Sequence, residues 1–122
     1  MDSLSDQNSV LDVDELSARC LGRVELVERV LDRFQQSMGK EFAELERALE
    51  EVNVDALAGI SHRIKGTSLT VSAHFLNRRA QLLEDAVKSR QVDAVAANVG
   101  ALKEEWVRVH ELITSLSSRE LP

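Results

Sequence analysis

Helical periodicity runs through almost the whole of this chain, and no proline interrupts it. The only proline of the 122 residues is the last one, Pro122, and there are only 5 glycines. Proline breaks helix interiors and glycine weakens them, so such a chain is free to form long helices. Apolar residues recur at intervals of three and four, which is typical of helices with one buried face. No segment resembles a strand, and the chain is predicted to be all-α.

Five helices are predicted. Glycines or capping residues indicate some of their ends more clearly than others. They span about residues 12–20, 23–52, 53–71, 72–88 and 92–117. Gly22 is expected to end the first helix, and Gly39 is a point at which the second can kink or divide. Asn53 and Ser72 are expected as N-caps of the third and fourth helices. The boundary before Ser72 contains neither glycine nor proline, so its position is weakly defined.

The number and length of these segments define an architecture. Four long amphipathic helices with short connections predict an antiparallel four-helix bundle. The short first helix is expected to cover one end of it. A chain of 122 residues is of the size of one domain. We therefore expect a flexible tail over residues 1–11 and a bundle domain over residues 12–118.

Charge and composition exclude several classes of partner. The chain has 15 basic and 21 acidic residues, a net charge of −6, whereas nonspecific nucleic-acid binding needs a basic surface. No apolar run approaches the roughly 18 residues of a membrane span, and the polar start lacks the pattern of a signal peptide. The single Cys20 has no disulfide partner within the chain, which favours a reducing compartment. We expect a cytoplasmic monomer that binds neither nucleic acid nor membrane.

The stretch Ser61-His62-Arg63-Ile64-Lys65-Gly66-Thr67-Ser68 is the best candidate for a functional site. Lys65 and Gly66 follow His62 by three and four residues, so all three share one face of a helix. The imidazole thus has a cation beside it and an empty position one turn away. Glycine costs roughly 1 kcal/mol against alanine in a helix interior, which suggests that space is needed there.

The direction of His62 follows from the apolar stripe of the same helix. That stripe is Leu57, Ile60, Ile64, Ser68 and Val71. At 100° per residue His62 lies roughly opposite, towards solvent. Its outer face is small and apolar where a solvated face is normally charged, and we expect it to bind a partner. We place Ala58, Gly59 and Leu69 on this face with Arg63 and Lys65 flanking it, and Arg78 and Arg79 are possible additional cations nearby.

This arrangement suits a phosphoryl carrier. The imidazole nitrogen can act as the nucleophile towards a phosphoryl group. Lys65 can stabilise the resulting anion through charge-assisted hydrogen bonds, and Gly66 leaves room for the partner's active site. A single surface histidine on a helix is more often simply solvated. The combination with lysine, glycine and a small apolar face favours phosphoryl transfer instead.

These residues resemble the histidine-containing phosphotransfer (HPt) domain family. The family pattern is His-x-x-Lys-Gly followed by a small residue, matched by His62, Lys65, Gly66 and Thr67, and its later leucine-alanine-leucine-glutamate run is matched over residues 76–84. The similarity covers most of residues 10–116, although only the part around His62 is specific. Many members have a glycine where this chain has Ser72, and Ala or Ser are frequent where it has Thr67 and Ser68.

The resemblance implies an activity and a set of partners. It implies a phosphorelay role in which His62 is the phosphoacceptor through Nε2, Lys65 stabilises the phosphate and Gly66 permits access. The implied partners are receiver domains of response regulators or hybrid histidine kinases, docking on the face with Ala58, Gly59, Arg63 and Leu69.

Other classes of function have weaker support. No ATP-binding motif is present, so we expect a carrier that is not itself an enzyme and needs no cofactor. Di-iron bundles use Glu-x-x-His pairs, and none of His62, His74 and His110 has a glutamate three residues before it, so no metal site is expected. The main alternative is a non-catalytic helical adaptor that binds a receiver or kinase without phosphotransfer.

Overall fold

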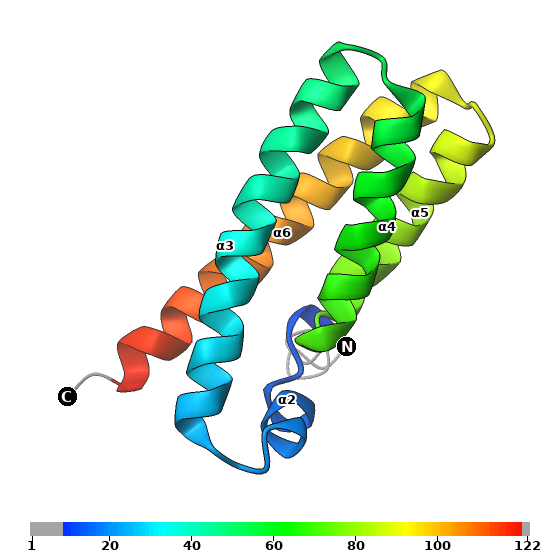
Figure 1. Ribbon diagram of the computed structural model, residues 1–122. Helices are drawn as coiled ribbons and strands as arrows, with labels where there is room; N and C mark the ends of the chain where they lie inside the picture. The colour runs from blue at the N-terminus through cyan, green and yellow to red at the C-terminus, as the bar shows by residue number, and fades with distance from the viewer. Residues whose placement is uncertain (1–8, 121–122) are drawn as a thin grey trace.

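The protein is a bundle of helices, seen in a computed structural model that describes residues 9–120 and side chains as far as residue 116. The helices are α2 (Val13–Arg19), α3 (Val24–Glu50), α4 (Val54–Thr70), α5 (His74–Lys88) and α6 (Val92–Glu120). Helix α3 packs against α4 and α6, and α5 packs against the same two, so the four long helices close into a ring (Figure 1). Helix α2 lies at one end against α3. The predicted all-α bundle with a short additional helix is confirmed.

The predicted apolar stripes form the core of the bundle. Fully buried positions come from all four long helices: Met38, Leu45, Ile64, Leu76, Leu83, Leu102 and Val109. Trp106 of α6 contacts two aromatic rings of α3, edge-on to Phe34 at 5.6 Å between ring centroids and stacked on Phe42 at 5.9 Å. Such pairs add to the stabilisation from apolar burial. No described helix combines the length and apolar character needed to cross a membrane.

The helices end in left-handed residues that are not glycine. Leu21, Val52, Ser72 and Arg90 have φ of 57°, 51°, 60° and 56°. At each, the N–H of the left-handed residue and that of the next residue donate to carbonyls of the preceding helix in the Schellman pattern. For Ser72 these are Ser72 N–H to Leu69 O at 3.1 Å and Ala73 N–H to Ser68 O at 2.9 Å. Hydrogen bonding therefore ends α3, α4 and α5 without the glycine that usually signals an end, whereas at the end of α2 the next residue, Gly22, is also left-handed with a φ of 72°.

Two sequence expectations need correction at these ends. Ser72 is not the N-cap of α5, because it occupies the left-handed position after α4 and Ala73 precedes the helix. Helix α3 ends at Glu50 and not at Val52, which lies in the turn with 69% of its surface exposed. Helix α3 also continues through Gly39 as one element. Asn53, by contrast, caps α4 as predicted, accepting a hydrogen bond from Ala56 N–H at 3.1 Å.

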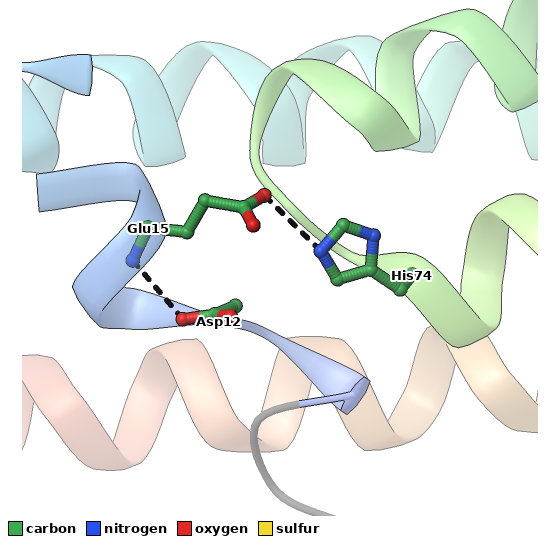
Figure 2. Close-up of side chains that lie close together, drawn as sticks. All are labelled: Asp12, Glu15 and His74. Carbon is green, nitrogen blue, oxygen red and sulfur yellow. Dashed lines mark hydrogen bonds and ion pairs between the residues drawn. The ribbon is translucent and has the colours of Figure 1, made fainter. Parts of the chain in front are cut away.

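Helix α2 is held to the turn between α4 and α5 by a small polar cluster (Figure 2). Asp12 caps α2 by accepting from Glu15 N–H at 3.0 Å. The Glu15 carboxylate accepts from the Ser72 hydroxyl at 2.6 Å. It also lies 3.1 Å from Nε2 of His74. The ligand-type atoms of Asp12, Glu15 and His74 lie within 4.8 Å of one another, and these hydrogen bonds account for their closeness. We name this cluster the α2 clamp.

The packed part of the chain includes residues just before α2. Leu11 is only 1% exposed, and Val10 packs against the core. The N–H of Asp12 donates to Ser72 O at 3.0 Å and fixes the backbone at this point. The rest of the expected tail, residues 1–8, lies outside the described residues.

Candidate functional site

His62 projects from the middle of α4 into solvent. Its side chain is 68% exposed, whereas Ile60 and Ile64 on either side are 3% and 0% exposed. Ser61 and Ser68 are fully buried and donate their hydroxyl groups to the carbonyls of Leu57 and Ile64, both at 2.6 Å. Because these small side chains satisfy their polar groups within α4, the helix packs closely on its neighbours. The outward direction predicted for His62 is what the structure shows.

A buried carboxylate on α5 lies directly beneath the imidazole. Glu84 is only 3% exposed, and its Oε2 lies 3.0 Å from Nδ1 of His62. Lys65 donates from Nζ to Oε1 at 2.8 Å, and Nζ of Lys88 lies 3.4 Å from Oε2. The Lys65 hydrogen bond, with the charges of Lys65 and Lys88 and the contact with His62, lowers the pKa of Glu84 despite the opposing effect of burial.

This carboxylate determines which ring nitrogen of His62 carries the hydrogen. An ionised carboxylate only accepts hydrogen bonds. Nδ1 of His62, 3.0 Å from Glu84 Oε2, is therefore assigned as the N–H donor. In the neutral ring the lone pair then lies on Nε2, which has no hydrogen-bond partner among residues 9–116. The contact with Glu84 thus orients the imidazole and leaves Nε2 as the ring nitrogen available for reaction.

Lys65 and Gly66 follow His62 on α4 as the sequence predicted. The structure adds Glu84 of α5 as the partner of Lys65. The Lys65 side chain is 24% exposed and extends along α4 to Glu84. Its backbone carbonyl accepts from Nδ2 of Asn77 at 2.9 Å, which ties α4 to α5 beside the site. Gly66 is exposed, and a Cβ built there has nothing within 4 Å. The glycine therefore avoids no clash inside the chain, and the space that it leaves is open to solvent.

The four residues predicted to bind a partner have different surroundings. Leu69 lies on the His62 side and is 45% exposed, but Arg63 extends towards α3. Its guanidinium pairs with Glu41 at 3.0 Å and with Glu44 at 3.1 Å. A Cβ at Gly59 would lie 3.7 Å from Nη1 of Arg63, and Ala58 is partly buried.

Sequence reasoning missed the residues that support His62 from outside α4. Glu84 was noted only as part of a family-like run, although Lys88 four residues later was a signal for a paired carboxylate. Arg19 of α2 was also missed, and its guanidinium donates to the backbone carbonyl of Leu69 at the edge of the site. Arg78 and Arg79 do not add charge near His62, because they line a groove on another side of α5.

Comparison with known proteins identifies the class of protein that this fold and histidine site define. The sequence model of the Hpt domain family matches residues 29–117, and the chain belongs to this family. Among solved structures, histidine-containing phosphotransfer protein B (HptB) from Pseudomonas aeruginosa PAO1 superposes with a TM-score of 0.82 at 22% identity, over 90% of this chain and 96% of the other.

A second solved structure has the same fold. The HPT domain of an Hpt sensor hybrid histidine kinase from Shewanella superposes with a TM-score of 0.77 at 19% identity, over 93% of this chain and 98% of the other. No functionally curated protein gave a significant sequence match. At these identities the two structures establish the fold, and the chemistry rests on the site itself.

Proposed function

We propose that this protein is a histidine phosphotransfer protein of a two-component phosphorelay, with Nε2 of His62 as the phosphoacceptor. The observation that carries the proposal is the contact of 3.0 Å between Nδ1 of His62 and the buried Glu84 carboxylate. It fixes the exposed Nε2 as the nitrogen with the lone pair. Membership of the Hpt domain family supports the same role.

The proposed phosphoryl transfer from a receiver domain to His62 balances in bonds, charge and protons. The Nε2 lone pair attacks the phosphorus of an aspartyl phosphate on a receiver domain. The N–P bond forms as the P–O bond to the aspartate breaks, and the aspartate leaves as a carboxylate. No proton has to leave His62, so the ring with its Nδ1–H gains positive charge, which the Glu84 carboxylate stabilises. A cationic ring is also a good leaving group, so the same contact supports transfer onward to another receiver.

The lysines beside Glu84 are suited to the charge of the phosphoryl group. Glu84 takes one of the three N–H donors of Lys65 at 2.8 Å, and the others remain for phosphate oxygens. Lys88 is 65% exposed near the same carboxylate. Phosphoryl transfer depends mainly on positioning and electrostatics. In this proposal the receiver domain supplies its own acidic residues and metal ion, and the chain is a carrier rather than an enzyme.

The proposed partners are receiver domains of response regulators or hybrid histidine kinases. The exposed Leu69 and the open space at Gly66 lie on the same side of α4 as His62, and both favour close approach of another surface. We propose that the protein acts as a monomer in the cytoplasm, a reducing compartment that suits its single, buried Cys20.

Transfer from a radiolabelled phosphorylated receiver domain tests the proposed function. Wild type and His62→Gln are incubated with the same receiver, and the label on each is tested for stability in acid and base. We expect acid-labile, base-stable label on wild type alone. Equal labelling of His62→Gln contradicts the site. Binding to a receiver that passes no label to wild type supports the non-catalytic adaptor instead.

A further inference from the structure

We infer that a groove between α5 and α6 binds a small phosphate-bearing molecule that also carries an N–H or O–H donor, as a nucleotide does. The groove is lined by Val10, Phe75, Arg78, Arg79, Glu105 and Arg108. Nothing in the phosphotransfer role of His62 uses these residues, so the inference goes beyond that function.

The charge of the groove opposes the charge of the protein. Three guanidinium groups and one carboxylate line it, although the chain carries a net charge of −6. Arg108 is held in place by Glu105, with 2.9 Å between Nη1 and Oε1. Arg78 and Arg79 are exposed and make no ion pair with any residue that the structure describes. Guanidinium groups bind phosphate oxygens in a bidentate manner, so two of them are available for an anion.

Glu105 is a buried acceptor that needs a hydrogen-bond donor, which a simple anion does not provide. Its side chain is 4% exposed, and Oε2 is a buried side-chain atom with no hydrogen-bond partner among the described residues. A buried acceptor without a donor costs free energy, and more so when the group is charged. A ligand with an N–H or O–H donor beside its phosphate offsets this cost, provided that the Glu105 side chain shifts to meet it. The partly buried ring of Phe75 offers a surface on which a base can stack.

The groove is separate from the phosphoacceptor site. Phe75 precedes Glu84 by nine residues, which at 100° per residue places the two on opposite sides of α5. Glu84 faces His62 and α4, whereas Phe75 lies with Arg108 of α6. A ligand in the groove therefore contacts none of the groups that orient His62.

Isothermal titration calorimetry with guanosine diphosphate and with inorganic pyrophosphate tests this inference. Both carry linked phosphates, but only the nucleotide adds a base and donors. We expect guanosine diphosphate to bind about tenfold or more tightly than pyrophosphate, since a hydrogen bond to a charged group is worth about that factor. The double variant Arg78→Gln/Arg79→Gln should weaken both ligands about tenfold or more. Glu105→Gln should reduce the advantage of the nucleotide.

Matched controls separate the groove from general electrostatics. Arg29→Gln/Arg33→Gln removes the same charge from exposed positions of α3 and should leave both affinities unchanged, as should His62→Gln. The inference is overturned if neither ligand binds, if both bind equally, or if the two double variants lose affinity to the same extent. Loss of binding in His62→Gln also overturns it, because the ligand would then occupy the phosphoacceptor site.

Discussion

At the scale of single residues, the site depends on one buried charge. Glu84 is shielded from solvent yet ionised, because Lys65 and Lys88 pair with it and lower its pKa. Removing a buried carboxylate leaves its cations unpaired. The same group orients the one exposed imidazole of the site, so we expect changes at Glu84 to alter the chemistry of His62 as well as the stability of the fold.

Glu84→Gln should slow phosphoryl transfer to His62 by about tenfold or more, because groups that orient a histidine have effects of at least this size. An amide is a weaker acceptor for Nδ1–H and cannot stabilise a cationic ring. Rapid-quench kinetics with a phosphorylated receiver measures the rate. Glu44→Gln is the matched control, since Glu44 is 57% exposed and pairs with Arg63 on the α3 side. An unchanged rate in Glu84→Gln shows that the contact is only structural.

Gly66→Ala should raise the stability of the protein while it slows phosphoryl transfer. The added Cβ has nothing within 4 Å in the chain, so alanine should raise the free energy of unfolding by about 1 kcal/mol. The same methyl group occupies space next to His62 that we assign to the partner, so transfer should slow. Urea unfolding and transfer rates on one preparation measure both. A more stable variant with unchanged transfer argues against a role for this space.

At the scale of elements, the turns between helices use residues that are poorly suited to them. Each helix end from α2 to α5 has a side-chain-bearing residue at positive φ, a conformation that costs an L-residue about 1–2 kcal/mol. The hydrogen bonds of the Schellman pattern recover part of this cost. Sequence reasoning relies on glycine and proline as markers of turns, which explains why the α4–α5 boundary was weakly defined and Ser72 was assigned as a cap.

Val52→Gly should stabilise the protein by about 1 kcal/mol. Val52 is β-branched and 69% exposed at φ 51°, so little packing is lost with its side chain. Ser72→Gly should gain less, because it also removes the hydroxyl hydrogen bond to Glu15 at 2.6 Å. Chemical denaturation of both variants gives the comparison. Destabilisation by Val52→Gly contradicts the strain attributed to this turn.

The α2 clamp should weaken in acid. The hydrogen bond from the Ser72 hydroxyl is the main cause that holds the pKa of Glu15 below its ordinary value of 4.5, against the opposing effect of burial, and His74 and Arg19 lower the pKa further. A depressed pKa in the folded state gives stabilisation that is present above the ordinary pKa and is lost as the pH falls through the folded one. Glu15→Gln should therefore be less stable than wild type at about pH 7, with the difference shrinking near pH 3. A difference independent of pH rules out this linkage.

At the scale of the whole molecule, the periodicity of apolar residues was sufficient to predict the architecture. The stripe predicted for the third helix, which ends at Val71, is buried in the core, and His62 lies opposite it as expected. The contacts that complete the site were not predictable in this way. Glu84 lies 22 positions after His62, and only the packing of α5 on α4 shows that the two meet. The pairing of Arg63 with α3 was not predictable for the same reason, because the carboxylates that it contacts lie on a neighbouring helix.

The position of the phosphoryl group on the ring of His62 tests the central claim most directly. Heteronuclear NMR of the phosphorylated protein, labelled with ¹⁵N in histidine, distinguishes phosphorus bonded to Nε2 from phosphorus bonded to Nδ1. The contact between Nδ1 and Glu84 predicts phosphorylation at Nε2 of His62 with the hydrogen retained on Nδ1. Phosphorylation at Nδ1, or at His74 or His110, would contradict the account.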